Sequence, residues 1–324
     1  MLAVDYDEPG GPEVLKLIET AIPSINEDEV LIKVKSAGVN RPDIIQRQGN
    51  YPAPSGHSKL LGLEVSGIIE NIGNKVRKFS IGDKVGALVN GGGYAEFCKA
   101  NETSVFHIPK NISFNEAACI PECFFTAWSN LIMRGNLKKK QKILIHGGTS
   151  GVGIAAIQIA KLFDSYIITT VGNKEKVSFC KKLGVDKTIN YTELDFFEEI
   201  KKSKICGVDL VLDFIGGDYI NKNINILNDD GKLVNIGFQN GSKAEINFMK
   251  IMLKRLTITG STLRIRDNSF KGKVLNDLIK FVFPQIEKGI IKIYIDSIYK
   301  LDDVVKAHKR LDEGKHIGKI VLNI

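Results

Sequence analysis

With 324 residues, 43% of them hydrophobic and 25% charged, the chain can bury one large core or two smaller ones and still remain soluble. Its net charge of +8 is spread along the chain, and no apolar run approaches the ~20 residues of a membrane-spanning helix, so we expect no membrane contact. Residues 1–4 lack the basic start and long apolar segment of a signal peptide, which favours a cytoplasmic protein.

The cysteines are scattered and odd in number, without a C-x-x-C pair: Cys98, Cys119, Cys123, Cys180 and Cys206. This pattern predicts reduced, mostly buried thiols. Cys119 and Cys123 could share one helical face, but no histidine lies near them in the sequence, so we expect no metal there.

The first hundred residues are predicted to be rich in β-strands. Alternating apolar and polar residues predict strands over 30–35 and 67–73, a third beginning at residue 82, and a fourth over 94–97 after a glycine turn. From residue 114 to 133 the pattern is helical, with a break around Pro121.

From residue 142 onward, strands and helices alternate. The predicted strands cover 142–146, 166–171, 187–190, 208–213, 232–236 and 256–261, and the predicted helices cover 151–163, 173–183, 194–202, 217–227 and 247–254. This alternation predicts an α/β domain with a doubly wound parallel sheet. The tail, with strands over 291–295 and 319–322 and an amphipathic helix over 301–313, is expected to rejoin the first domain.

Four glycines lie within residues 147–153, between an apolar strand and a helix. A helix N-terminus carries free N–H groups and partial positive charge, and glycine lets a phosphate approach them closely. The stretch does not match G-x-G-x-x-G literally, and a purely structural turn is the alternative. The strand–helix units that follow favour a dinucleotide site.

The end of the next strand indicates which dinucleotide. NAD-binding folds place an acidic residue there to hold the ribose 2′-hydroxyl. Here Gly172 occupies that position, and Lys174 and Lys176 follow it. Glu175 lies in the first turn of a helix, where an acid is favoured in any case. We therefore expect NADP(H) rather than NAD(H).

Taken together, these motifs resemble the zinc-independent quinone oxidoreductases of the medium-chain dehydrogenase/reductase superfamily. The matching segments run through almost the whole chain in order: residues 1–4, 9–13, 40–41, 46–49 with Tyr51, 61–64, 91–93, 120–122, 144–146, 150–153 and 316–322. The resemblance implies a GroES-like catalytic domain formed by 1–118 and 264–324, a Rossmann domain formed by 119–263, and an active site in the cleft between them.

Two departures from the wider superfamily matter. Zinc-dependent members carry a cysteine at the position of Asn40 and Gly-His-Glu at the position of Gly62-Leu63-Glu64, and many have a four-cysteine lobe where this chain has only Cys98. Since zinc needs three or four such ligands, we expect no metal. Ser150 replaces a glycine, and its hydroxyl is expected either to bind the diphosphate or to cap the helix.

The resemblance also implies a set of cofactor-binding residues. They are Ser150, Gly151, Val152 and Gly153 at the diphosphate; Gly172, Asn173, Lys176 and Tyr191 at the 2′-phosphate; Ile215 and Gly216 at the adenine side; Gly237, Phe238, Thr126 and Asn40 at the nicotinamide end; and Leu263, Arg264 and Lys319 from the returning chain. The alternatives are a half-buried strand end for Tyr191, a core position for Phe238 and an exposed loop charge for Arg264.

The expected function is NADPH-dependent reduction of quinones, with a homodimer formed through the edge strand near residues 255–260. Without zinc, hydrogen-bond donors must meet the charge that develops on the acceptor, and the candidate catalytic residues are Tyr51 and Asn40, both expected on the loop after the first strands. Tyr51 could instead only pack against cofactor or substrate.

Three other functions remain open at this stage. One is an enone or alkenal double-bond reductase. The others are a nucleic-acid-binding protein and a structural protein that retains a cofactor site. Nucleic-acid binding is disfavoured because no aromatic residues interleave the lysine runs.

Overall fold

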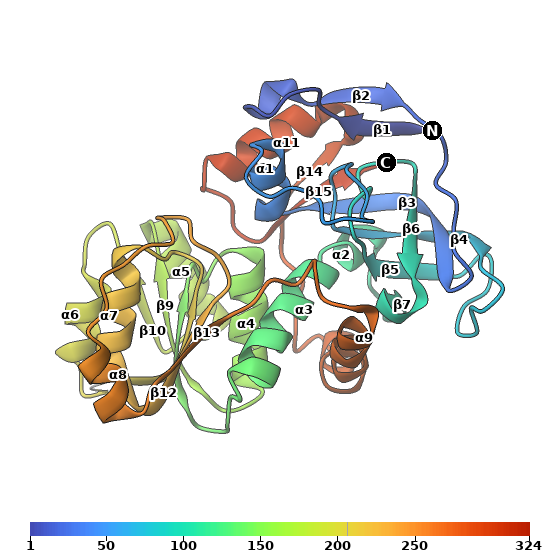
Figure 1. Cartoon of the computed structure of the whole chain (residues 1–324). Helices are drawn as coiled ribbons and strands as arrows, with labels where there is room; N and C mark the ends of the chain where they lie inside the picture. The colour runs from blue at the N-terminus through green and yellow to red at the C-terminus, as the bar shows by residue number, and fades with distance from the viewer. Residues whose placement is uncertain (206) are drawn as a thin grey trace. The chain divides into compact units, whose positions relative to one another are not determined.

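The computed structural model describes residues 1–205 and 207–324, and it divides the chain into two compact units. The terminal unit combines Met1–Phe125 with Arg264–Ile324, and the middle unit is Thr126–Leu263 (Figure 1). The predicted fold class is confirmed, because a β-rich unit forms from both chain ends and a parallel α/β unit forms between them. The domain boundaries expected at 118/119 and 263/264 stay a prediction.

The middle unit is a six-stranded parallel sheet with helices on both faces. Its strands are β8 (Lys142–His146), β9 (Tyr166–Val171), β10 (Lys187–Asn190), β11 (Val208–Asp213), β12 (Leu227–Asn235) and β13 (Thr257–Gly260), in the order β10-β9-β8-β11-β12-β13. Strand order reverses between β8 and β11, which is where open parallel sheets bind ligands.

The helices of this unit match the predicted positions closely. They are α4 (Gly151–Lys161), α5 (Lys174–Leu183), α6 (Phe196–Lys201), α7 (Asp218–Ile226) and α8 (Phe248–Lys254). Figure 1 shows α4 on one face of the sheet and α6, α7 and α8 on the other. Both faces of the central strand β8 are therefore covered, and its residues 143–145 are fully buried.

One strand of this unit begins earlier than expected. The sequence predicts a helix up to residue 227 and a strand from 232, but α7 ends at Ile226 and β12 begins at Leu227. The segment Asn228-Asp229-Asp230-Gly231 reads as a turn, and Asp230 does have a positive φ of 61°. The strand nevertheless continues through this segment. β12 pairs with β11 at Leu227, before the segment, and again from Lys232 onward, with a register shift between the two stretches.

The terminal unit is built on a seven-stranded mixed sheet. Its strands are β3 (Glu29–Val39), β4 (Glu64–Ile72), β5 (Lys84–Leu88), β6 (Phe97–Asn101), β7 (Val105–His107), β14 (Ile295–Lys300) and β15 (Lys319–Asn323). Six of them follow the order β14-β15-β3-β4-β5-β7, and β6 also pairs with β3. A separate antiparallel pair joins β1 (Leu2–Asp5) to β2 (Lys16–Glu19).

Short helices connect and cover these strands. They are η1 (Pro12–Val14), α1 (Arg41–Arg47), η2 (Glu102–Ser104), α2 (Phe114–Ala117), α9 (Asn268–Asp277), η4 (Leu278–Val282), α10 (Phe283–Glu287), η5 (Leu301–Asp303) and α11 (Val304–Asp312). The helix α3 (Pro121–Trp128) and its continuation η3 (Ser129–Arg134) run across the boundary between the units. The helix predicted over 301–313 is therefore present as η5 and α11.

Three predictions for the terminal unit were wrong in position. The strand expected over 94–97 begins at Phe97, and the strand expected over 291–295 begins at Ile295. The Tyr294 carbonyl accepts the backbone N–H of Lys319 at 2.9 Å, one residue ahead of Ile295, where the parallel pairing of β14 with β15 begins. Asn40, expected on a loop, caps α1, and the helices over 268–287 were not predicted.

Cys98, Cys119, Cys123 and Cys180 are buried free thiols, as predicted, and Cys206 lies outside the described residues. Among the described residues, no helix combines the length and the apolar character needed to cross a bilayer.

Candidate functional site

The N-terminus of α4 faces the carboxyl edge of the parallel sheet, and Ser150 organises it. Ser150 is the N-cap: its Oγ accepts the N–H of Gly153 at 3.0 Å and donates to the carbonyl of Gly147 at 2.9 Å. Of the two roles expected for this hydroxyl, the structure shows the helix cap. The N–H groups of Gly151 and Val152 belong to the first turn, where an α-helix provides no acceptors for them.

The glycines before α4 are required by close packing. Gly147 has a φ of 61°, and a Cβ there would collide with the ring of Phe214. A Cβ on Gly148 would collide with Thr169, and one on Gly153 with the carbonyl of Gly147. The turn therefore exposes backbone rather than side chains at the helix N-terminus, which suits a phosphate group.

The next two strands bring four of the expected residues together. Gly172 follows β9, and a Cβ on it would lie 2.5 Å from the hydroxyl of Tyr191, which follows β10. Asn173 caps α5 by accepting the N–H of Lys176 at 2.8 Å. Tyr191 is 51% exposed, so the ring is available at this edge. No carboxylate occupies the position after β9, and Lys176 supplies a positive charge in the first turn of α5.

Two further loops follow β11 and β12 at the same edge. The N–H groups of Ile215 and Gly216 bind the buried carboxylate of Asp213, at 2.7 Å and 3.3 Å respectively. Gly237 packs against Phe214, and Phe238 is 48% exposed, so Phe238 is not a core residue. The loops after five parallel strands thus carry the expected dinucleotide residues, and their chemistry fits a nucleotide with a phosphate on its adenosine ribose.

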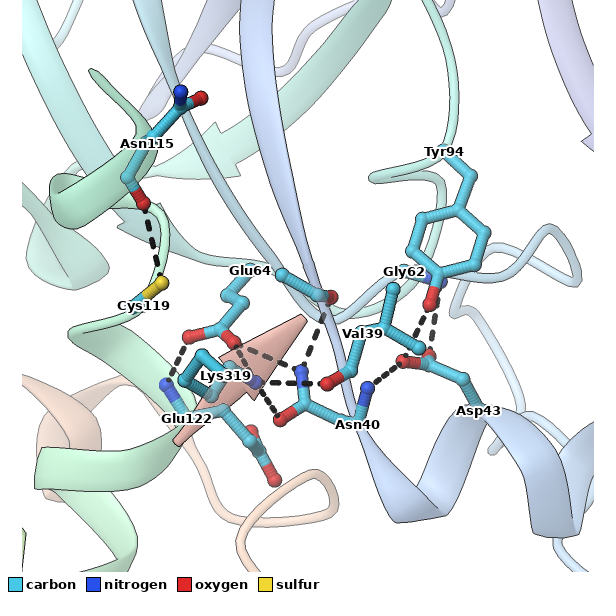
Figure 2. Close-up of polar contacts among 11 residues, drawn as sticks. Val39, Asn40, Asp43, Gly62, Glu64, Tyr94, Asn115, Cys119, Glu122 and Lys319 are labelled. Carbon is cyan, nitrogen blue, oxygen red and sulfur yellow. Dashed lines mark hydrogen bonds and ion pairs between the residues drawn. The ribbon is translucent and has the colours of Figure 1, made fainter. Parts of the chain in front are cut away.

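In the terminal unit, a buried ammonium group organises the residues around Asn40 (Figure 2). Lys319 Nζ lies 2.6 Å from Glu64 Oε1 and donates to Asn40 Oδ1 at 2.6 Å and to the Val39 carbonyl at 2.9 Å. Burial is the largest single effect and opposes the charge on Lys319, but the Glu64 carboxylate together with Cys123 and Cys119 outweighs it and raises the pKa of Lys319 above its usual range. Lys319 is therefore a permanent positive charge with all three hydrogens engaged.

This network also engages both N–H groups of the Asn40 amide. They donate to Glu64 Oε1 at 2.9 Å and to the Gly38 carbonyl at 3.3 Å, and Asn40 is only 6% exposed. A direct contact of Asn40 or Lys319 with a bound molecule would have to replace one of these bonds.

Asp43 continues the network toward α1 and Tyr94. Its carboxyl accepts the N–H of Asn40 at 2.8 Å, the N–H of Gly62 at 3.1 Å and the hydroxyl of Tyr94 at 2.9 Å. Burial raises the pKa of Asp43 to about 6 in spite of these bonds. Because the capping box between Asn40 and Asp43 begins α1, the network fixes the start of this helix against β4.

Tyr51 and Arg264 meet within the terminal unit. The guanidinium carbon of Arg264 lies 5.8 Å from the centre of the Tyr51 ring, within the range of a cation–π contact. Arg264 donates to Gln46 Oε1 at 2.6 Å and to the Ser58 carbonyl at 3.1 Å, while its buried Nε has no hydrogen-bond partner among the described residues. Arg264 is 4% exposed, so it is not an exposed loop charge.

Lys271, on the unpredicted helix α9, lies close to this pair. Its ammonium donates to Asn90 Oδ1 at 2.6 Å and to the Arg264 carbonyl at 3.0 Å, and it is 2% exposed. Burial lowers the pKa of Lys271 to about 8. A lysine in an amphipathic helix usually lies at the surface, so no sequence signal identifies this one.

The remaining expected residues lie at the ends of the middle unit. Thr126 is its first residue, within α3, and its carbonyl accepts from Asn130 Nδ2 at 2.9 Å. Leu263 is its last residue and is buried. Glu64, Asp43 and Glu122 were not expected to have roles, although Glu64 and Glu122 lie within the motifs that carried the resemblance.

Within residues 1–205 and 207–324, no group of three or more His, Cys, Asp or Glu side chains could hold a metal ion.

Two family models match the chain: an alcohol dehydrogenase GroES-like domain over residues 26–122 and a zinc-binding dehydrogenase over residues 151–279. The chain is 32% identical to the human quinone oxidoreductase over 326 residues, covering 99% of this chain and 97% of that protein. The Escherichia coli quinone oxidoreductase in complex with NADPH is 28% identical, covers all of both chains and has a TM-score of 0.89.

A CurK enoyl reductase structure is 27% identical, with a TM-score of 0.88 over 99% of this chain and 98% of that one. The sequence identity, the coverage and the two-unit fold agree with one another. The chain belongs to the quinone oxidoreductase-like members of the medium-chain dehydrogenase/reductase superfamily and is an oxidoreductase.

Proposed function

We propose that this protein is an NADPH-dependent quinone reductase. The observation that carries the cofactor preference is the end of β9, where Gly172 stands in place of an acid and Lys176 lies in the first turn of α5. A carboxylate there would repel a 2′-phosphate, whereas a lysine stabilises it. The E. coli quinone oxidoreductase, a structure of similar fold, is known in complex with NADPH.

When bound, NADPH would supply a hydride to the acceptor. The chain's own residues have three tasks in this proposal. The loops after β8, β9, β10, β11 and β12 hold the dinucleotide through backbone N–H groups and Lys176. Tyr51 donates its hydroxyl hydrogen to the oxygen of the acceptor, where negative charge develops. Arg264 holds the Tyr51 ring in place and adds positive charge near it.

We propose in addition that the reaction needs no zinc. The ammonium of Lys319 lies 2.6 Å from both Asn40 Oδ1 and Glu64 Oε1. A divalent cation at the same oxygens would meet this fixed positive charge at close range, and the repulsion disfavours its binding.

The homodimer is also a proposal, and its support is the edge of the middle unit. The strand β13 ends the sheet, and Ile258 on it is 36% exposed. An exposed apolar edge strand favours pairing with a second copy. A small uncharged acceptor and a cytoplasmic location complete the proposal.

A second candidate function is reduction of the double bond of enones or alkenals, and the observation in its favour is the similarity to an enoyl reductase structure. Steady-state oxidation of NADPH and of NADH, measured with a panel of quinones and a panel of enones and alkenals, tests both. We expect NADPH to be preferred and quinones to be reduced fastest. Faster reduction of the enals would favour the second function, and no oxidation with either panel would contradict both.

A further inference from the structure

Thr170, on β9, holds the first part of the glycine turn before α4. Its hydroxyl accepts the N–H of Gly147 at 3.3 Å, and its carbonyl accepts the N–H of Gly148 at 3.2 Å. The carbonyl of Gly147 in turn accepts the Ser150 hydroxyl at 2.9 Å. One hydroxyl group on each side therefore fixes the two peptide groups of Gly147, whose φ of 61° starts the turn.

The Thr170 hydroxyl is oriented by the imidazole of His146, its neighbour across the β8–β9 pair. Nδ1 of His146 lies 3.0 Å from Thr170 Oγ1, and Nε2 lies 2.9 Å from Asn223 Oδ1 on α7. An amide oxygen only accepts hydrogen bonds, so the neutral ring carries its hydrogen on Nε2, and Nδ1 accepts the Thr170 O–H. The hydrogen bonds therefore all run in one direction, from the Gly147 N–H through the hydroxyl and the imidazole to Asn223.

This chain of hydrogen bonds is closed off from solvent. His146, Thr170 and Asn223 are at most 1% exposed, and burial lowers the pKa of His146, so the ring is neutral at pH 7. The imidazole packs edge-on against the rings of Phe196 and Tyr219, whose centres lie 4.8 Å and 5.0 Å from its own. Helices α6 and α7, which carry these rings, cover this face of the sheet (Figure 1). Since water has no access, losing one member of the chain leaves a buried polar group without a partner.

Asn223 extends the chain of hydrogen bonds to a second loop of the proposed cofactor site. It lies on α7, whose N-cap is Gly217, directly after Ile215 and Gly216. His146 itself ends β8, where the glycine turn begins. One imidazole thus connects the loops that follow β8 and β11, the neighbouring strands between which the strand order reverses.

We propose that His146 is a positioning residue for the diphosphate of the cofactor, an inference that rests on the proposed function. Its Nδ1 orients the Thr170 hydroxyl, and this hydroxyl holds the Gly147 N–H. The turn then keeps the backbone shape that leaves the N–H groups of Gly151 and Val152 open to a phosphate. The imidazole is buried, so it acts through the turn and touches neither the cofactor nor the acceptor.

The experiment separates the two hydrogen bonds of the imidazole in the full-length protein. Asparagine Oδ1 and imidazole Nδ1 are the same number of bonds from Cβ, so His146→Asn keeps an acceptor for Thr170 and loses the bond to Asn223. Glutamine Nε2 corresponds to imidazole Nε2 in the same way, so His146→Gln keeps the bond to Asn223 and loses the acceptor. Thr170→Val removes the hydroxyl at nearly constant volume. The control, Thr188→Val, changes a half-buried threonine on β10 of the same sheet.

Fluorescence titration gives the Kd of NADPH and of NADH, and urea unfolding without cofactor gives the stability of each variant. We expect His146→Gln and Thr170→Val to weaken both cofactors about tenfold, since each loses one buried hydrogen bond that holds the turn and the diphosphate is common to both cofactors. His146→Asn should stay within about threefold of the wild type, and Thr188→Val should match it. A purely structural histidine predicts the opposite order, because asparagine leaves the larger cavity.

The proposal is overturned if His146→Gln and Thr170→Val keep the wild-type Kd values, if His146→Asn binds more weakly than His146→Gln, or if only NADPH binding is weakened. If the His146 variants do not fold, unchanged Kd values in Thr170→Val overturn it instead. A wild-type protein that binds NADPH but oxidises it with no acceptor would contradict the proposed function and not this inference, which separates the two failures.

Discussion

Lys319 and Glu64 form a buried ion pair, with Nζ and Oε1 2.6 Å apart and side-chain exposures of 6% and 0%. It joins the last strand, β15, to β4 in the first part of the chain. The second oxygen of Glu64 holds the N–H of Glu122, so the same carboxylate also fixes the start of α3. One pair of charges therefore ties together three segments that are far apart in the sequence.

We predict that Lys319→Met destabilises the protein by about 3–5 kcal/mol, because it leaves the Glu64 carboxylate buried without a partner. The double variant Lys319→Met/Glu64→Gln should recover a large part of this loss, since it removes the unpaired charge. Urea unfolding of both variants measures the difference. Lys16→Ala, which breaks an exposed pair with Asp7, should change stability by less than about 1 kcal/mol. Equal losses in the single and double variants would show that the charge of Glu64 is not the cause.

A second prediction concerns acid sensitivity and the buried His308. Arg47 donates to His308 Nδ1 at 3.2 Å, which requires the neutral ring, and burial lowers the pKa of His308 to about 3. A lowered folded-state pKa means that this contribution to stability is complete above pH 6.5 and is lost as the pH falls toward 3.

His308→Gln keeps an acceptor for Arg47 but cannot take up a proton. Its stability should fall less steeply than that of the wild type between pH 6 and 4, by up to about 1.4 kcal/mol per pH unit. Urea unfolding at several pH values measures the slopes, and the exposed His107→Gln is the control. Parallel slopes for His308→Gln and the wild type would contradict the assignment.

The cofactor preference is tested by Lys176→Ala. We expect NADPH binding to weaken about 10- to 150-fold, because one charge-assisted hydrogen bond to a phosphate is worth about 1.5–3 kcal/mol. NADH binding should change far less. Fluorescence titration gives both Kd values, and Lys182→Ala, an exposed lysine near the other end of α5, is the control. If NADPH and NADH lose affinity equally, Lys176 does not bind the 2′-phosphate.

The donor role of Tyr51 is tested by Tyr51→Phe. We expect a lower kcat with NADPH affinity unchanged within about twofold, and a greater loss with an electron-rich quinone that is harder to reduce. A donor aimed at developing charge is worth up to about 3 kcal/mol, and easily reduced quinones should lose less. Tyr166→Phe in the middle unit is the matched control. An unchanged kcat on every acceptor would show that Tyr51 only packs against cofactor or substrate and donates no hydrogen bond to the acceptor.

The assembly is tested by light scattering at micromolar concentration. We expect twice the chain mass of 35.8 kDa for the wild type. Ile258→Asp on β13 should give the monomer, because a buried carboxylate without a partner disfavours strand pairing. Ile290→Asp, at an isoleucine in the terminal unit that is 61% exposed, should remain dimeric. A monomeric wild type would exclude the proposed dimer.

The sequence by itself determined the two-part fold and most of the residues at the carboxyl edge of the parallel sheet. Residues 143–145, the glycines of 147–153 and the cap at Ser150 lie within one strand–turn–helix unit, so local patterns specify them. Gly172, Asn173 and Lys176 follow the next strand, and parallel pairing brings its end to the same edge. The local sequence indicated a wrong start for β12, because the turn-like residues around Asp230 lie inside the strand.

Only the tertiary structure decided the surroundings of Asn40 and Glu122. Lys319 lies 279 positions from Asn40, and Lys271 lies 181 positions from Asn90, so no periodicity relates the partners. Whether Lys319 is a free cation or a buried partner of Glu64 depends on desolvation and on hydrogen bonds that exist only after the two chain ends pair. The same physical reason explains why Glu122 reads as an ordinary helix-start acid in the sequence, whereas burial raises its pKa to about 8 in the folded protein.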